Sequence, residues 1–370
     1  MTARGWGIYV HVPWCRVRCP YCAFYVEPDR DADWPGWTGG ILREYNARIG
    51  DFEVGARTLF IGGGTPSLLP VADLATLVAN IALEPGAEVS IEANPEDVDR
   101  GWLDAAITAG ANRLSLGIQT FNPNFARLLN RAHSVKQARE VAEMVAQTDL
   151  KSWSVDLIFG LPGQSLADLH VDIDHVLATG APHVSLYGLT IEPGTPFERA
   201  RDRGTLIPAS DELWRAMYDA LVERLEAAGL HRYEVSNFAR PGHRSRHNAS
   251  YWQGMPYMGL GPSAHGFLPD GRRYVNIRNA TGYSQLARPT DTIERPTPTQ
   301  AAADRIISGL RAVEGIVVDD LPVAIRPGTI DMLVQGGVLS RSGERIALTP
   351  AGFPIADAVV NRLVEALQGG

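Results

Sequence analysis

The sequence predicts an α/β protein: a parallel sheet of strand–helix units, followed by a smaller α+β unit at the C-terminal end. Three observations support this prediction. Six short apolar segments alternate with helical segments over residues 1–232, and helical crossovers join parallel strands. Glycines and unusual polar residues follow the ends of these strands, where parallel α/β folds carry their chemistry. After residue 232 the composition changes and the alternation stops.

The expected strands are short and β-branched, or alternate between apolar and polar residues. They cover residues 7–12, 58–61, 88–93, 113–118, 153–159 and 183–189. We expect helices at residues 33–49, 70–83, 97–109, 122–147, 166–179 and 211–228. Ser165 is a typical N-cap for the fifth of these helices. Six units are too few to close an eight-stranded barrel, so we expect an open, partial (β/α)6 barrel over residues 1–232.

The rest of the chain is expected to form two further regions. Residues 233–299 are rich in Tyr, Trp, Asn, His, Gly and Pro, and end in a linker with several prolines and threonines. Residues 300–370 predict a helix, a turn, two short strands and a helix, an order similar to a winged-helix fold. This C-terminal winged-helix-like domain has no concentrated basic helix, so we expect a docking or lid domain and not a DNA-binding one.

All three cysteines of the chain, Cys15, Cys19 and Cys22, fall within eight residues. One short loop therefore brings three thiolates close to a single metal centre. Three ligands leave a position open on a zinc ion or on a four-iron cluster. The odd number of cysteines and the absence of a secretion signal argue against a structural disulfide. Zinc with His11 as fourth ligand, and inert buried thiols, are the alternatives.

Composition narrows the functional class. The net charge of −8 argues against a nucleic-acid-binding surface. No apolar run approaches the ~20 residues of a membrane span. The N-terminus reaches a predicted strand within a few residues, so we expect neither a signal nor a transit peptide. A cytoplasmic, reducing compartment follows from these expectations and suits an iron–sulfur cluster.

The spacing C-x3-C-x2-C, with an aromatic residue before the last cysteine, resembles that of the radical S-adenosylmethionine (SAM) superfamily. The resemblance implies a 4Fe-4S cluster on Cys15, Cys19 and Cys22, with one open iron chelated by SAM. Reduction of that cluster then cleaves SAM into methionine and a deoxyadenosyl radical. The glycine-rich residues 62–66 would cradle the SAM amino group, because glycine lets backbone approach a ligand closely; alone, they could equally form a tight turn.

Four more polar residues lie at or beyond strand ends: Glu92, Gln119, Arg131 and Asp156. Each one alone is more often a solvated residue or a helix cap. Together they offer carboxylates for the ribose diol and ammonium of SAM, and Arg131 offers a charge-assisted partner for its carboxylate. Tyr9, on the first strand, can pack beside the cysteine loop.

Further motifs narrow the resemblance. Residues 90–95 (SIEANP), 115–121 (SLGIQTF), 129–133 (LNRAH) and 156–164 (DLIFGLPGQ) are similar to segments of oxygen-independent coproporphyrinogen III oxidases and their relatives. Residues 185–197 (SLYGLTIEPGTPF) and 247–252 (HNASYW) resemble one related family in particular, the HemW heme chaperones. By this resemblance the SAM contacts are Tyr9, Gly63, Gly64, Thr65, Glu92, Gln119, Arg131 and Asp156.

Two departures separate the chain from the oxidases. Phe24 stands where the oxidases carry a further cysteine, and only eight residues precede Tyr9 where they have an N-terminal extension. Both departures match the chaperone family. His247 lies beside aromatic residues, which suits an axial heme ligand, although a lone histidine is a weak ligand signal. The resemblance implies that this segment binds heme through His247.

The sequence thus favours a heme chaperone that binds a 4Fe-4S cluster, SAM and heme, and delivers heme to recipient proteins such as respiratory enzymes. The opposing hypothesis is an oxygen-independent coproporphyrinogen III dehydrogenase, which would abstract hydrogen from propionate side chains. A radical enzyme acting on an unrelated substrate is a third. We expect a monomer or homodimer that neither spans a membrane nor binds nucleic acid.

Overall fold

The computed structural model describes residues 5–52 and 55–368. Six parallel strands form the centre of its large sheet, as predicted. In spatial order they are β1 (Gly7–Val12), β4 (Ala56–Gly63), β5 (Leu83–Ala93), β6 (Arg113–Gln119), β7 (Ser152–Phe159) and β8 (His183–Gly188). Their spatial order follows the chain order, because each crossover returns the chain to the next position in the sheet.

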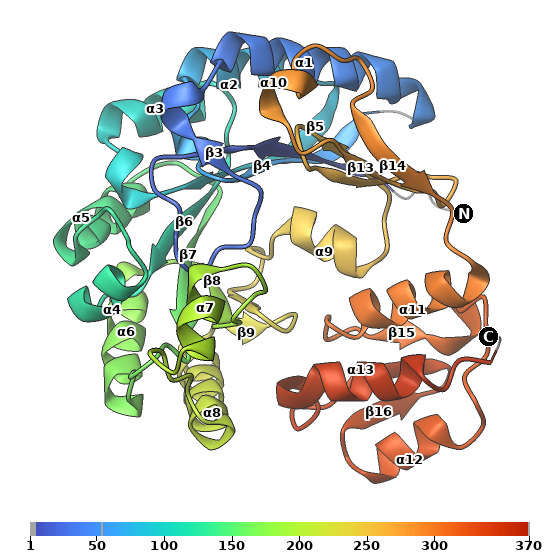
Figure 1. Ribbon diagram of the computed structural model, residues 1–370. Coiled ribbons are helices and arrows are strands. Elements are labelled where there is room, and N and C mark those ends of the chain that lie inside the picture. The colour runs from blue at the N-terminus through green and yellow to red at the C-terminus, as the bar shows by residue number, and fades with distance from the viewer. Residues whose placement is uncertain (1–4, 53–54, 369–370) are drawn as a thin grey trace.

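Helices cover the outer face of this curved sheet (Figure 1). They are α1 (Trp34–Arg48), α2 (Val71–Asn80), α3 (Arg100–Thr108), α4 (Pro123–Leu128), α5 (Val135–Ala146), α6 (Leu166–Thr179) and α8 (Asp211–Ala227). The short helix α7 (Pro196–Asp202) lies instead near the carboxyl ends of the strands, where the backbone N–H of Phe197 bonds the carbonyl oxygen of Pro20. Ser165 caps α6 as predicted, through a capping box with Asp168. The main core lies between these helices and the strands, where Ile8, Leu59 and Leu77 are fully buried.

Two helix predictions differ from the structure. The expected helix 122–147 is interrupted between α4 and α5, where Asn130 has a positive φ of 55°. The expected helix 70–83 ends at Asn80, and β5 begins at Leu83. In both places the sequence continues without a glycine or proline, the residues that usually announce a break.

Residues 231–294 extend both edges of the sheet, a role that the sequence did not predict. On one side β10 (Asn237–Ala239) pairs antiparallel with β8, and β9 (His231–Arg232) pairs with β10. On the other side β11 (Tyr257–Leu260) lies parallel to β1, with Gly7 opposite Tyr257. Antiparallel strands β12 (His265–Phe267), β13 (Arg273–Asn276) and β14 (Thr290–Glu294) then complete a twelve-stranded sheet within the described residues.

The C-terminal residues form a separate layer beside the open side of the barrel (Figure 1). They comprise α11 (Pro298–Gly309), β15 (Ile316–Val317), α12 (Thr329–Gln335), β16 (Leu339–Ser342), β17 (Arg345–Leu348) and α13 (Ala356–Val364). The three strands form a small antiparallel sheet. Between this layer and the barrel lies α9 (Arg246–Trp252). Over the described residues, no helix combines the length and apolar character needed to cross a membrane.

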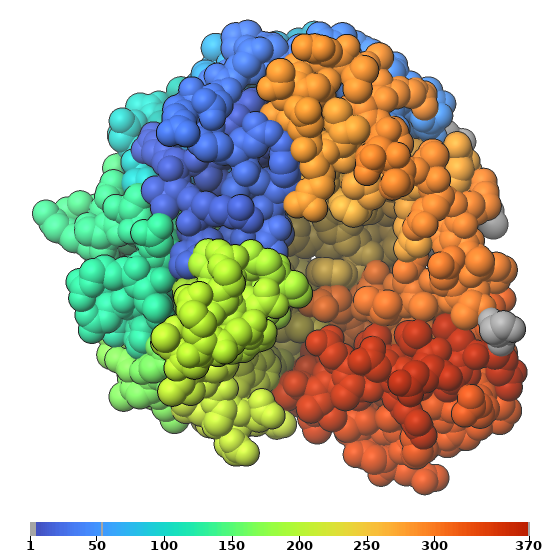
Figure 2. All heavy atoms as spheres, viewed as in Figure 1, coloured from blue at the N-terminus to red at the C-terminus, as the bar shows by residue number. Residues whose placement is uncertain are grey.

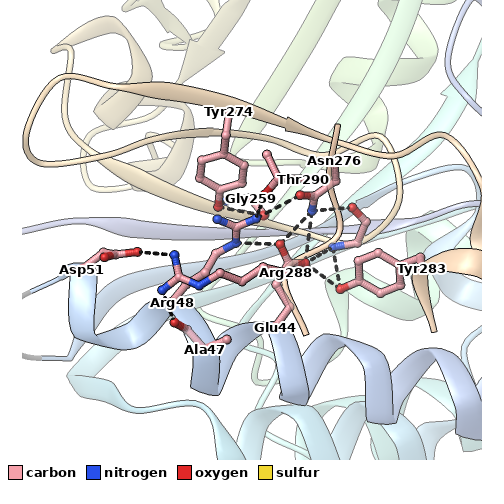
Figure 3. Close-up of polar contacts among 11 residues, drawn as sticks. Glu44, Ala47, Arg48, Asp51, Gly259, Tyr274, Asn276, Tyr283, Arg288 and Thr290 are labelled. Carbon is pink, nitrogen blue, oxygen red and sulfur yellow. Dashed lines mark hydrogen bonds and ion pairs between the residues drawn. The ribbon is translucent and has the colours of Figure 1, made fainter. Parts of the chain in front are cut away.

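A buried polar network fastens α1 to the segment that follows β11 (Figure 3). Glu44 is fully buried and bonds Arg48 Nε at 2.7 Å, Tyr283 Oη at 2.7 Å and Asn276 Nδ2 at 2.9 Å. It also accepts the backbone N–H of Gly261 at 3.2 Å. Gly261 has a φ of 101°, and a Cβ there would lie 2.6 Å from the carbonyl oxygen of His11. The network therefore holds this segment against the end of β1.

Candidate functional site

The cysteine loop is closed at its base by a short strand pair. β2 (Trp14–Cys15) lies parallel to β3 (Glu27–Pro28). At the end of β1, His11 Nε2 lies 3.0 Å from the carbonyl oxygen of Tyr25. Since a carbonyl only accepts, Nε2 carries the imidazole proton, and Nδ1 accepts from the Tyr9 hydroxyl at 3.0 Å. The two ends of the loop are therefore tied together independently of any metal.

The glycine segment after β4 packs directly against this loop. Gly63 has a φ of 116°, and a Cβ there would lie 2.6 Å from the His11 ring. A Cβ on Gly64 would lie 2.6 Å from the carbonyl oxygen of Trp14. Only glycine allows both the conformation and the close approach. Thr65 follows, and its hydroxyl donates to Cys15 Sγ at 3.3 Å.

Two carboxylates from neighbouring parts of the sheet face the same space. Asp156, in β7, accepts from Ser115 Oγ at 2.9 Å, and burial raises its pKa despite hydrogen bonds from Ser185 and Ser115. Glu92, in β5, accepts the backbone N–H of Gly63 at 3.1 Å. Burial, together with the nearby Asp156, raises the pKa of Glu92 to about 8. Glu92 is therefore largely protonated at neutral pH. The carboxyl groups of Glu92 and Asp156 both remain available to polar ligands.

Arg131 lies between the cysteine loop and the sheet. Its Nη1 donates to Cys19 Sγ at 3.6 Å, and its Nη2 donates to the carbonyl oxygen of Gly117 at 2.7 Å and to Asn94 Oδ1. Nε is buried without a hydrogen-bond partner. The guanidinium therefore contacts a sulfur with one nitrogen and keeps another donor free. Gln119, at the end of β6, adopts a φ of 71°, an uncommon conformation for a non-glycine residue.

A cavity of about 560 Å³ brings most of the predicted residues together. Ten of the twelve line it: Cys15, Cys19, Cys22, Gly63, Gly64, Thr65, Glu92, Gln119, Arg131 and Asp156. Figure 2 shows a hollow between the blue N-terminal region, the yellow-green segment after β8 and the orange and red C-terminal residues; its floor has the yellow-brown colour of the region around α9, which does not line this cavity. The polar residues that the sequence placed at strand ends thus share one cavity with the cysteine loop.

The other two predicted residues, Tyr9 and His247, line a second cavity of about 230 Å³. Both cavities are bordered by Glu92, Asp156 and Tyr187, so they meet at the two carboxylates. His247 lies at the opposite ends of the strands from the cysteine loop, because it contacts Thr58 near the start of β4. The structure does not bring His247 to the cysteines.

The His247 imidazole is buried and makes hydrogen bonds through both ring nitrogens. Nδ1 lies 2.7 Å from Thr58 Oγ1, and Nε2 lies 2.8 Å from the Tyr251 hydroxyl. The ring stacks on Phe60 with centroids 5.1 Å apart. Burial lowers the pKa of His247 to about 3, which keeps the ring neutral. In this conformation neither nitrogen is free to bind a metal.

Several residues of the site were missed by the sequence analysis. Ser115, Ser154 and Ser185 surround Asp156 from three adjacent strands. Ser115 lies directly opposite Ser154, and Asp156 opposite Ser185, in the parallel pairing. The signal was a serine on each of three adjacent strands, opposite Asp156 or two residues before its level, which becomes visible only once the register is known. Asn94, which bonds Arg131, directly follows the predicted strand that contains Glu92.

The three thiols of the loop face one cavity. Within residues 5–52 and 55–368, no three His, Cys, Asp or Glu side chains are grouped closely enough to hold a single metal ion. The three thiols border one cavity, as the cysteine ligands of an iron–sulfur cluster would. Burial raises the pKa of Cys15 to about 11 and also raises that of Cys22. A coordinating metal would remove these protons, as it does from protein thiols generally.

Comparison with known sequences identifies one superfamily and relatives that share one name. The profile of the radical SAM superfamily matches residues 9–176. The chain is 36% identical over 330 residues to a protein named heme chaperone HemW from Synechocystis sp., with 85% of this chain and 80% of the relative covered. It is 34% identical to the heme chaperone HemW of Mycobacterium tuberculosis, with 98% of this chain and 96% of the relative covered.

The fold is similar to that of a solved enzyme. The structure of coproporphyrinogen III oxidase (HemN) from Escherichia coli superimposes with a TM-score of 0.81, covering 97% of this chain and 90% of the enzyme. The two sequences are 20% identical over this match. At that identity the likeness concerns the fold, and it confirms the predicted α/β radical SAM architecture.

Proposed function

Because the chain belongs to the HemW heme chaperone family of radical SAM proteins, we propose that it binds a 4Fe-4S cluster, SAM and heme. In this proposal it delivers the heme to recipient proteins, such as respiratory enzymes. The carrying observation is the single cavity in which the three cysteines meet the glycine segment, the two carboxylates and Arg131. A cytoplasmic setting belongs to the proposal, because partly exposed unpaired cysteines suit a reducing compartment.

Cys15, Cys19 and Cys22 would hold three irons of the cluster and leave the fourth iron open to SAM. The bound cluster would supply one electron for the reductive cleavage of SAM. The loop is prepared for this group by the His11–Tyr25 contact at its base and by the β2–β3 pair. These contacts hold the loop's backbone so that cluster binding orders few additional residues.

Around the open iron, this chain's own groups would orient SAM. The backbone of Gly63 and Gly64 offers a surface without side chains, and Asp156 offers carboxylate oxygens for hydroxyl or ammonium groups. Arg131 borders the cavity and offers its positive charge to a carboxylate, and its buried Nε has no partner within the protein. Glu92, with its raised pKa, can donate or accept a hydrogen bond according to pH. Tyr9 lies on β1 before His11, and its ring is next to the His11 ring.

Heme would pack at the mouth of the cavity, where aromatic rings are exposed. Phe24 is 64% exposed and Tyr187 is 44% exposed, and both border the cavity. Flat aromatic rings suit a porphyrin face. His247 is the proposed axial ligand, in its neutral form. To bind the iron it must give up its hydrogen bond to Tyr251 or to Thr58.

One experiment separates a chaperone from a coproporphyrinogen III dehydrogenase. The protein is purified without oxygen, reconstituted to about four irons per chain, and titrated with heme and with coproporphyrinogen III in the presence of SAM and dithionite. We expect saturable heme binding and no protoporphyrinogen IX. Turnover of coproporphyrinogen by the cluster-loaded protein would overturn the chaperone proposal, and stoichiometric zinc without iron–sulfur absorption would overturn the cluster.

A further inference from the structure

Two side chains that the resemblance assigns to SAM make direct contacts to cysteine sulfurs. The Thr65 hydroxyl donates to Cys15 Sγ at 3.3 Å, and Arg131 Nη1 donates to Cys19 Sγ at 3.6 Å. Both distances lie within hydrogen-bonding range for the large sulfur atom. The two donors come from different parts of the chain, the turn after β4 and the loop after α4. They approach two different cysteines of the loop.

The position of Arg131 is determined by groups that do not touch the cysteines. Nη2 is held by the carbonyl oxygen of Gly117 and by Asn94 Oδ1. The backbone N–H of Asn94 is in turn bonded to Ser67 Oγ at 3.1 Å. A Cβ on Gly117 would lie 3.0 Å from Asn94 Oδ1, so glycine leaves the room that this arrangement needs. The guanidinium is therefore oriented toward Cys19 before any ligand binds.

The position of Thr65 is equally constrained. Thr65 is 5% exposed, and its carbonyl oxygen accepts the backbone N–H of Leu68 in the turn that follows β4. The hydroxyl makes its hydrogen bond to Cys15 Sγ with a donated proton. If the Thr65 side chain turned away from Cys15 Sγ, the buried hydroxyl would lose this hydrogen bond, which is unfavourable. The loss therefore favours the observed orientation of Thr65.

We propose that Thr65 and Arg131 set the reduction potential of the cluster through Cys15 and Cys19, in addition to any contact with SAM. The inference rests on the proposed cluster. Reduction adds one electron to the cluster, and the added negative charge is shared by its sulfur ligands. Hydrogen bonds and positive charge at these sulfurs stabilise the reduced form and raise the potential. Arg131 combines both effects, because its guanidinium always carries a charge.

The test is a dithionite titration of the reconstituted protein, followed by the spectrum of the reduced cluster, without SAM. Leaving SAM out removes any effect through SAM binding. Thr65→Val removes the hydroxyl and keeps the shape, whereas Thr65→Ser keeps a donor. Arg131→Met removes the charge and the donors, and Arg131→Lys keeps a charge. We expect Thr65→Val and Arg131→Met each to lower the reduced-to-oxidised ratio about tenfold at a fixed solution potential, equal to 59 mV for one electron.

The conservative variants and one control make the result specific. Thr65→Ser should restore most of the potential lost in Thr65→Val, and Arg131→Lys should fall between wild type and Arg131→Met. Thr38→Val is the matched control, because Thr38 is 4% exposed on α1 and its hydroxyl has no hydrogen-bond partner. It should leave the potential unchanged.

The outcomes separate this inference from the proposed function. Unchanged potentials in fully loaded Thr65→Val and Arg131→Met would overturn the inference and leave the cluster intact. If one of these variants fails to load a cluster, the other decides together with Arg131→Lys, whose potential should lie below that of wild type; a potential equal to that of wild type in both counts against the inference. Failure of the wild-type protein to load iron would instead overturn the proposed function.

Discussion

Replacing Arg48 by methionine should destabilise the protein strongly, and the loss should depend on pH. Arg48 and Glu44 are only 2% and 0% exposed, and their side chains are 2.7 Å apart. Arg48 also donates to Thr290 Oγ1 at 2.8 Å and lies over the Tyr274 ring at 3.8 Å. Methionine would keep much of the packing volume but leave the Glu44 carboxylate buried without its cation. Breaking a buried pair in this way costs about 3–5 kcal/mol.

The pH dependence follows from the direction of the Glu44 shift. Burial already raises the pKa of Glu44, against the opposing effect of Arg48 and the hydrogen bonds from Tyr283 and Asn276. Without Arg48 that pKa rises further. The folded variant then keeps a proton that the unfolded chain releases, so its free energy of unfolding falls as pH rises above the unfolded pKa. The penalty of Arg48→Met should therefore be smaller at pH 5 than at pH 8.

Urea unfolding followed by circular dichroism, at both pH values, measures this penalty. The double variant Glu44→Gln/Arg48→Met should recover part of the stability, because no unpaired charge remains buried. Arg215→Met, which breaks an exposed pair with Asp219 on α8, is the control and should change stability by at most ~1 kcal/mol. A penalty that is the same at pH 5 and pH 8, with no recovery in the double variant, would refute the reasoning.

Four further expectations concern the site. Cys19→Ala should fail to retain about four irons per chain after anaerobic reconstitution, measured by iron analysis; full iron content would remove Cys19 from the cluster. Asp156→Ala should weaken SAM binding at least tenfold in calorimetry, because a hydrogen bond to a charged group contributes ~1.5–3 kcal/mol, and unchanged affinity would exclude this contact. The affinity of the protein for SAM should rise between pH 7 and pH 9, as Glu92, with a pKa of about 8, loses its proton and can accept from SAM. Glu92→Gln should abolish that rise, and the same dependence of SAM affinity on pH in Glu92→Gln and wild type would contradict this expectation. Tyr251→Phe removes the hydrogen bond to His247 Nε2 and should strengthen heme binding in a spectroscopic titration, whereas His247→Ala should weaken it; equal affinities in both would exclude His247 as the ligand.

The parts of the fold that could be predicted are those with a long periodic signal. The six central strands and most of their helices carry five or more patterned residues each, and the rule that parallel strands place their carboxyl ends together located the carboxylates and glycines correctly. The edge strands β9 to β13 have two to four residues each. Segments of that length hold too few residues for a period, and only their neighbours in the sheet define them.

Within the site, residue type could be predicted better than contact. The expected contact of Arg131 with the SAM carboxylate stays a prediction, and its partners within the protein, Cys19, Asn94 and Gly117, were not foreseen. The motif identifies a cation near the cysteines, but the direction of its nitrogens depends on the bend at Asn130, which the sequence did not announce. His247 illustrates the same limit: the motif predicts an imidazole beside aromatic rings, and the fold decides that Thr58 and Tyr251 bind both its nitrogens.

The pairing of β1 with β11 also has a consequence for the order in which the protein matures. Gly7 and Tyr257 are neighbours in the sheet although 250 positions separate them in the chain. During synthesis β1 can pair with β4 early, but its other edge waits for β11, and the exit of the cysteine loop waits for Ala280, whose N–H bonds Tyr25 Oη at 3.2 Å. Contacts between residues so distant in sequence form late in folding. The loop reaches its final surroundings only once about three quarters of the chain has left the ribosome, so the proposed cluster would find its complete protein environment only after that point.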